Sequence, residues 1–177
     1  MDKSNGLMYG VAAVKFKTSE GEEKTLGWLD ENGMQPAGNA PTFMDVMAAQ
    51  VTDGPVDSIM TNPGSDAFTM NLIKLDAQSM VDVFGGKKEA DDSYTPPVKF
   101  VANGVLTISM HSGHSFRIFN ARLSRNGFQN GINMQNVLAM GIRVDMLKPT
   151  DGKERRYRTY PPGVTPDESD STADAAG

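Results

Sequence analysis

The chain has 177 residues, enough for one domain with a sizeable core, and its 22% charged and 38% hydrophobic residues are ordinary for a globular protein. It contains no cysteine, which excludes disulfides, thiolate metal sites and cysteine nucleophiles. The net charge of -5 argues against a nucleic-acid-binding protein, because such a protein needs a basic face to neutralise phosphates. The sequence shows no apolar run of signal-peptide or membrane-span length, so we expect an intracellular protein or one released without a cleaved signal.

Turn signals punctuate the chain at the spacing of an all-β domain. The Asn-Gly pair is a strong hairpin signal, because both residues tolerate positive φ. It occurs five times, at Asn5-Gly6, Asn32-Gly33, Asn103-Gly104, Asn126-Gly127 and Asn130-Gly131. We therefore predict short antiparallel strands connected by turns.

The first predicted unit is a hairpin. Its strands are Met8–Lys17 and Lys24–Glu31, joined across the turn "TSEGEE". Trp28, the only tryptophan, alternates with Leu26 and is predicted to lie in the core. A long loop, Glu31–Thr42, follows the hairpin.

Three further strands are predicted to form a meander: Thr42–Val51, Val56–Thr61 and Asp66–Leu75. In the last of them the apolar side chains begin on one face of the strand and then change to the other face at Ile73 and Leu75. This pattern favours a strand that is covered on both faces, with a second subunit as one candidate for the cover.

The segment Leu72–Lys88 predicts a two-turn helix. Asp76 is expected to cap its N-terminus, and Gly85 supplies the backbone conformation that ends it. The apolar stripe between them consists of Met80, Val83 and Phe84. Because two turns cannot stand alone in water, we expect this stripe to dock on a sheet.

Four strands are predicted after the helix: Val98–Ala102, Val105–Met110, Ser115–Ser124 and Asn136–Leu147. The last one alternates regularly, with apolar side chains on one face and Arg143 and Asp145 on the other. The third changes phase between Ile118 and Phe119, which predicts either a β-bulge or two covered faces.

The composition changes after Pro149. Residues 1–149 are predicted to form the β domain, and residues 150–177 a polar, acidic extension that is peripheral to the fold. The extension contains a basic patch of Lys153, Arg155, Arg156 and Arg158. The acidic run from Asp167 onward opposes nucleic-acid binding by this patch, so a solvated or partner-docked tail is predicted.

The sequence predicts no catalytic, cofactor-binding or metal-binding residues, and therefore a protein that is not an enzyme. His111 and His114 flank a turn without a nearby carboxylate, so they make a poor metal site. The motif "FGGKK" lacks the first glycine, the preceding strand and the hydroxyl residue of a phosphate loop. Asp91 and Asp92 are adjacent, so they point to opposite sides of an extended segment.

These elements together predict a mainly β protein, an antiparallel β-sandwich or open β-barrel flanked by one short α-helix. The order of hairpin, loop, meander, helix "LIKLDAQSMVDVFGG" and later strand "FRIFNARLS" resembles the major tail tube proteins of tailed bacteriophages. More distantly, it is similar to the tube proteins of bacterial injection systems. The resemblance covers residues 7–148.

The resemblance implies a structural virion protein that assembles in the cytoplasm of a bacterial host. Such proteins form homohexameric rings, which stack into the tail tube and line a channel for genome ejection. The partners implied are further copies of the chain, the tape measure protein, the tail terminator and the baseplate proteins. DNA passes through transiently and without specificity, no cofactor is involved, and the chain does not insert into a membrane.

Two other classes remain open at this stage. Another virion ring protein, such as a tail terminator or a capsid decoration protein, would form a ring that does not polymerise. A soluble β-sandwich or barrel that binds a small ligand would be a monomer or dimer with an internal apolar pocket.

Overall fold

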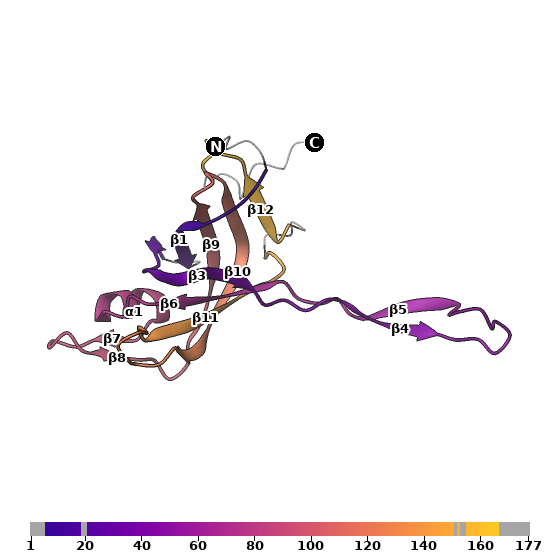
Figure 1. The fold of residues 1–177 in the computed structure, drawn as a ribbon, viewed down its shortest axis with the longest axis horizontal. Helices are drawn as coiled ribbons and strands as arrows, with labels where there is room; N and C mark the ends of the chain where they lie inside the picture. The colour runs from indigo at the N-terminus through magenta and orange to yellow at the C-terminus, as the bar shows by residue number, and fades with distance from the viewer. Residues whose placement is uncertain (1–5, 19–20, 151, 153–154, 167–177) are drawn as a thin grey trace.

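The computed structural model describes residues 6–18, 21–150, 152 and 155–166, and in this part the chain is mainly β with one short helix (Figure 1). The helix is α1 (Ala77–Phe84). The strands are β1 (Val11–Thr18), β2 (Glu23–Thr25), β3 (Leu29–Pro36), β4 (Thr42–Val46), β5 (Asp57–Asn62), β6 (Ala67–Leu72), β7 (Lys87–Lys88), β8 (Tyr94–Thr95), β9 (Val101–Met110), β10 (Ser115–Gln129), β11 (Ala139–Met146) and β12 (Tyr157–Tyr160). The predicted fold class, antiparallel β with one flanking helix, is confirmed.

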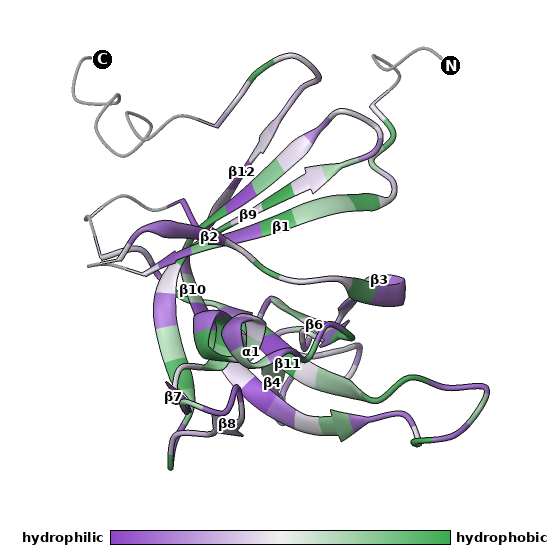
Figure 2. Cartoon of the chain, turned by 90° about the vertical axis from the view of Figure 1, so that its left-hand side faces the viewer, coloured by the Kyte–Doolittle hydropathy of each residue, from purple (hydrophilic) through white to green (hydrophobic). Residues whose placement is uncertain are grey.

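The main sheet has the strand order β2-β1-β9-β10-β11-β6-β3, and β12 pairs with β10 beside this path. The long strand β10 changes partner along its length, with β12 beside Ser115 to Ile118 and β11 beside Ala121 onward. Its register against β9 shifts between Ile118 and Ala121. A register shift, the first of the two alternatives that the phase change predicts, is therefore present, and it lies where the sheet bends into two halves (Figure 2).

The core draws on both halves of this bent sheet and on the helix. Its most deeply buried apolar side chains are Met70, Leu72, Leu106, Ile118, Leu123, Ile142 and Val144. On β11 the apolar residues alternate with Arg143 and Asp145, but the strand is not half-buried as this alternation predicts, because all of its residues except Arg143 are buried, Asp145 included.

Helix α1 has the predicted N-cap and the predicted buried face, whereas Gly85 at its end has a ψ of -158° and so lies outside the left-handed helical region. The side chain of Asp76 accepts a hydrogen bond from the backbone N–H of Ser79, and Gly85 ends the helix at a φ of 71°. Met80, Val83 and Phe84 are buried. The Phe84 ring meets that of Phe100 edge to face at 5.1 Å, so the helix is docked on the segment that leads into β9.

The structure corrects the prediction between β2 and β3. Strand pairing stops at Thr25 and resumes at Leu29, so the alternation that placed Trp28 beside Leu26 does not apply there. Leu26 is buried, whereas the Trp28 side chain is 74% exposed, and the prediction of a core tryptophan is wrong. The predicted loop Glu31–Thr42 also begins too early in the sequence, because β3 continues to Pro36.

Three predicted turns lie inside strands, and the first of them, Asn32-Gly33, is part of β3. Asn103-Gly104 is part of β9, where a Cβ on Gly104 would lie 2.1 Å from the carbonyl oxygen of Lys17. This glycine therefore permits close approach of two strands rather than a turn, and the two strands predicted around it are one. Asn126-Gly127 lies within β10 at a second register shift, between Arg125 and Phe128.

The predicted meander is divided between two sheets. β4 and β5 pair only with each other, whereas β6 pairs with β3 and β11 in the main sheet. The change of face at Ile73 follows the end of β6 at Leu72. It is therefore explained by the end of the strand and gives no argument for a second subunit.

Residues after Pro149 contribute a strand to the main sheet, so the prediction that the whole extension is peripheral to the fold is wrong. β12 pairs with β10 from Ser115 to Ile118, and Tyr160 is buried. The ring of Tyr157 stacks on Phe116 at 4.8 Å. The acidic end from Asp167 lies outside the described residues.

Candidate interaction surface

The two histidines lie in different surroundings on the β9–β10 turn. His114 is buried, and its Nδ1 lies 3.1 Å from the hydroxyl of Ser112, while His111 is exposed and bonds through its backbone to Gly10. In the described part of the chain no three His, Asp or Glu side chains come together as metal ligands. The pair serves the packing of the β9–β10 turn.

The lysines of "FGGKK" and the two adjacent aspartates belong to one small hairpin, β7–β8. Lys88 pairs with Asp92 at 2.7 Å, and Lys87 pairs with Glu89 at 3.1 Å. Asp91 accepts hydrogen bonds from Ser93, which hold the pKa of its carboxyl below the ordinary value. These charges are used in local turn contacts, and they do not converge on a phosphate or acid–base site.

The most prominent surface feature is a two-stranded arm, defined here as residues 37–66. It contains β4 and β5 and projects far from the body of the molecule (Figure 1). Large apolar side chains of the arm are between 36% and 66% exposed: Phe43, Met44, Met47, Val51, Val56, Ile59 and Met60. So many exposed apolar side chains on one projection are typical of an interaction site.

The arm is apolar on both of its faces. Phe43 pairs with Met60 across the two strands, and Met44 pairs with Ile59 in the next position. Because neighbouring positions on a strand point to opposite faces, the two pairs lie on opposite faces of the ribbon. A two-stranded ribbon alone is marginally stable in water, and the paired apolar side chains of this ribbon are exposed on both faces.

The root of the arm continues the pairing of β3 with β6. Backbone bonds join Ala37 to Ala67 and Asn39 to Ser65 at 2.8 Å. A Cβ on Gly38 would lie 2.2 Å from the carbonyl oxygen of Ser65, so the two strands pass too close there for a side chain. The arm is therefore an extension of the main sheet and has a defined direction.

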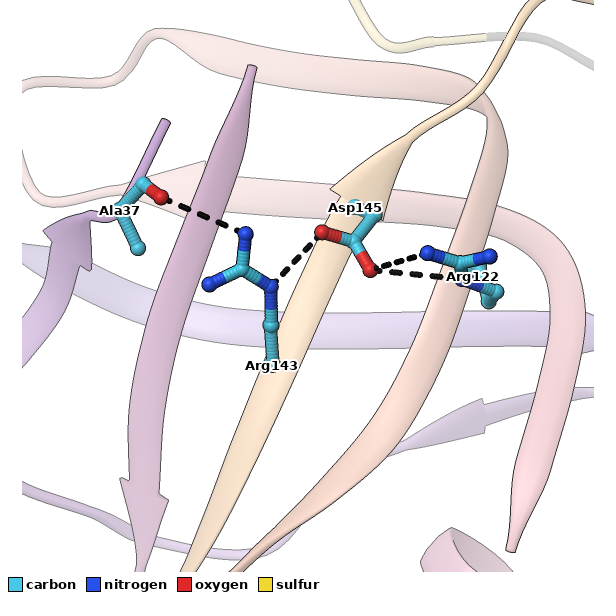
Figure 3. Close-up of polar contacts among 4 residues, drawn as sticks. All are labelled: Ala37, Arg122, Arg143 and Asp145. Atoms are coloured by element: carbon cyan, nitrogen blue, oxygen red, sulfur yellow. Dashed lines mark hydrogen bonds and ion pairs between the residues drawn. The ribbon is translucent and has the colours of Figure 1, made fainter. Parts of the chain in front are cut away.

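A charge cluster lies at the root, with a buried carboxylate, Asp145, between the partly exposed side chains of Arg122 and Arg143 (Figure 3). Asp145 accepts hydrogen bonds from Arg122 on β10 and Arg143 on β11, each at 2.8 Å, and Arg143 also donates to the carbonyl oxygen of Ala37 at 3.4 Å. Burial alone would raise the pKa of Asp145, but the hydrogen bonds and charges of the two arginines outweigh it and lower the pKa. The cluster thus connects the arm to two strands of the sheet.

A second exposed apolar surface lies at the other end of β6 and β11. We call it the basic end and define it as residues 98–101 and 125–138, around the end of β10. Six of its large apolar side chains are at least 57% exposed: Val98, Val101, Phe128, Ile132, Met134 and Val137. Sequence reasoning missed it because Asn130-Gly131 marked this stretch only as a turn, although Ile132 and Met134 are unusual in a solvated turn.

The predicted basic patch of the C-terminal extension contacts the chain's own body. Arg156 pairs with Asp66 at 3.5 Å, the Arg155 guanidinium lies 4.4 Å from the centre of the Phe119 ring, and Arg158 lies over the Tyr160 ring. Lys153 lies outside the described residues. The prediction that this patch docks on a neighbouring subunit remains a prediction.

The described residues include no helix with the length and apolar character needed to cross a membrane. Comparison of the chain with protein-family models and with curated proteins finds no match.

Proposed function

We propose that this chain is a self-assembling structural protein whose copies form rings that stack into a tube, as the tail tube proteins of bacteriophages do. In this proposal the tube is part of the virion tail and provides a channel for DNA. The tape measure, tail terminator and baseplate proteins are its partners. The observation that carries the proposal is the arm, which exposes apolar side chains on both faces.

The arm supports assembly because its exposed apolar pairs have no cover within the described chain. A stable protein–protein interface buries about 1,200–2,000 Å² in total, to which a projecting ribbon contributes two faces and a tip. Repeating the contact around a ring would cover every arm with another copy. The mainly β body with one docked helix agrees with the architecture that the resemblance implies.

The edges of the sheet give a second line of support. The described sheet runs from β2 to β3 without closing, and β2 covers only part of the outer edge of β1. Exposed sheet edges invite strand pairing with another chain, and native proteins protect them or use them as interfaces. A ring of copies would use these edges.

Negative-stain electron microscopy of the purified protein, together with light scattering across a concentration series, tests the proposal. Tubes or stacked rings are the expected result. Isolated rings that never stack would favour another virion ring protein, such as a terminator or decoration protein. A protein that stays monomeric at high concentration, alone and with tail extract, would overturn the proposal and favour a ligand-binding β protein.

A matched variant connects the assembly to the arm. Replacing residues 42–62 with a short Gly-Ser turn keeps the root pairing from Ala37 to Ala67 and removes the exposed apolar pairs. We expect this variant to remain folded by circular dichroism and to stay monomeric. Tubes formed by the shortened chain would show that the arm is not the assembly element.

A further inference from the structure

Acidic and basic residues are concentrated in different segments of this chain, which the net charge alone does not show. Residues 25–73 contain six acidic residues and no lysine or arginine. Residues 93–144 contain five lysines and arginines and no acidic residue. The arm lies wholly in the first segment and the basic end wholly in the second, so the two exposed apolar surfaces have opposite charge.

Three of the four acidic groups of the arm are available to a partner, whereas Asp66 at its root pairs with Arg156. Asp45, Asp53 and Asp57 are exposed, and none of them is in an ion pair within the described residues. Asp45 accepts only a hydrogen bond from Ser58 of the paired strand, and Asp57 accepts one from the backbone of the same residue. The arm therefore presents apolar side chains flanked by carboxylates.

The basic end offers the complement. Lys99 and Arg125 are exposed and are in no ion pair within the described part of the chain. Arg125 lies over the ring of Phe128, with 5.1 Å between the guanidinium carbon and the ring centre. Met134 is 99% exposed and Ile132 is 83% exposed in the adjoining connection. This surface combines apolar side chains with cations and lacks any carboxylate.

The two surfaces lie at opposite ends of the molecule. On the paired strands β6 and β11, Ala67 lies opposite Asp145 at the arm end, and Leu72 lies opposite Met140 at the other end. The basic end includes the β10–β11 connection, which leads into β11 just before Met140. Figure 2 looks onto this end, and in that view the arm of Figure 1 points away from the viewer.

We infer that the arm of one copy docks on the basic end of a second copy. The apolar side chains of the two surfaces are buried against each other, and the arm aspartates pair with Lys99 and Arg125. Because the two surfaces differ and lie at opposite ends, the contact is head-to-tail, so it closes into a ring or continues as a filament. This inference rests on the proposed function and specifies the partner surface and the polarity of assembly.

Charge reversal tests the inference. The first variant carries Asp45→Lys and Asp57→Lys, and the second carries Lys99→Glu and Arg125→Glu. Each alone should assemble at least about tenfold more weakly, because like charges then oppose each other across the contact. An equal mixture of the two should recover assembly, since each reversed arm then meets a reversed basic end and each native arm a native one. Failure of the mixture to recover, with both variants folded, would overturn the inference.

Matched controls separate charge at these sites from charge in general. Lys148→Glu and Glu22→Lys alter exposed residues outside the arm and the basic end, and both should assemble like the wild-type chain. Assembly of the wild-type chain should weaken between 0.1 M and 1 M salt, because the screening length falls from about 10 Å to about 3 Å. Wild-type assembly that is insensitive to salt and to both reversals would overturn the docking while leaving self-assembly intact.

Cross-linking tests direct contact. The chain has no cysteine, so Met47→Cys in the arm and Met134→Cys at the basic end introduce the only thiols. When the Met47→Cys and Met134→Cys variants are mixed and treated with a short thiol-reactive cross-linker, they should give a covalent dimer. A mixture of the Met47→Cys and Glu22→Cys variants should not. A wild-type chain that never self-associates overturns both proposals; tubes that form without the Met47–Met134 cross-link overturn only this one.

Discussion

Arg143 on β11 reaches the carbonyl oxygen of Ala37, with its Nη2 at 3.4 Å, at the point where the arm leaves the sheet. Its guanidinium is held there by Asp145, whose Oδ1 lies 2.8 Å from Nε. Asp145 in turn accepts from Arg122 on the neighbouring strand. One carboxylate therefore orients two arginines, and one of them, Arg143, contacts the backbone at the root of the arm.

Asp145→Asn should lower the free energy of unfolding by about 1–3 kcal/mol at pH 7, because two charge-assisted hydrogen bonds lose their acceptor charge. The folded-state pKa of Asp145 is lowered. Its stabilising contribution is therefore present above the ordinary carboxyl range and is lost as the pH falls through the lowered pKa, below about pH 4. Urea unfolding at several pH values should show the wild type and the variant converging in acid.

Asp53→Asn is the control for this pH series, because Asp53 lies in the exposed turn of the arm and is in no ion pair within the described residues. It should leave the free energy of unfolding within about 0.5 kcal/mol of the wild type. If Asp145→Asn shows the same small effect at pH 7, the cluster does not stabilise the fold.

Phe84→Ala tests the docked helix. Phe84 is 3% exposed and contacts the ring of Phe100, so its truncation should leave a cavity and cost about 3–5 kcal/mol in the free energy of unfolding. Gln78→Ala on the exposed face of the same helix should cost little. Thermal unfolding of both variants gives the comparison, and equal melting temperatures would contradict the docking.

The two glycines after the helix should respond differently to alanine. Gly85 has a φ of 71° and a ψ of -158°, a conformation that essentially only glycine adopts, with open space around a Cβ, so Gly85→Ala should cost about 1–3 kcal/mol from backbone conformation alone. Gly86 has a φ of 91°, and its Cβ would lie 2.4 Å from the carbonyl oxygen of Thr95. Gly86→Ala should therefore lower the melting temperature more than Gly85→Ala, and the reverse order would contradict this account.

The parts of the fold that could be predicted from the sequence are those set by local patterns. Asp76, the apolar stripe and Gly85 specify α1 within ten residues, and the alternation along β11 specifies a strand, although not that both of its faces are covered. The phase change after Ile118 predicts the bulge because side-chain alternation is broken there. Each of these signals depends only on neighbours in the chain.

The arm and the basic end could not be predicted in the same way. The apolar residues of β4 and β5 follow a pattern that buried strands also have. Only the pairing of β3 with β6, which are distant in the sequence, shows that the segment between them leaves the main sheet and that β4 and β5 pair with each other. At Gly104 the local pattern predicts a turn, but the position lies within a strand. It requires glycine because the carbonyl oxygen of Lys17, on another strand, leaves no room for a side chain. Contacts between distant segments decide these cases, and a single sequence contains no direct record of them.

Serine substitutions should reveal whether both faces of the arm are covered. Phe43→Ser with Met60→Ser removes one apolar pair, and Met44→Ser with Ile59→Ser removes the pair on the opposite face. Each double variant should raise the concentration needed for assembly by about tenfold or more, while unfolding of the body changes little. Light scattering gives the assembly threshold, and Thr42→Ser is the control. An effect from one pair alone would show that only one face of the arm is buried.

Two truncations should separate the sheet-forming part of the C-terminal extension from its acidic end. Ending the chain after Pro166 keeps β12, with its pairing to β10 from Ser115 to Ile118 and its buried Tyr160. We expect this variant to keep its melting temperature and its assembly, because it retains every described contact of the extension.

Ending the chain after Pro149 removes β12 as well. That change uncovers the edge of β10 and the ring of Phe116, which Tyr157 stacks on at 4.8 Å. Loss of a buried aromatic side chain costs about 3–5 kcal/mol, and the exposed strand edge adds a route to aggregation. We therefore expect a lower melting temperature and less folded protein from the shorter chain only. Equal melting temperatures for the two truncations would show that β12 is not needed for the body, whereas loss of folding in the longer one would show that the acidic end stabilises it.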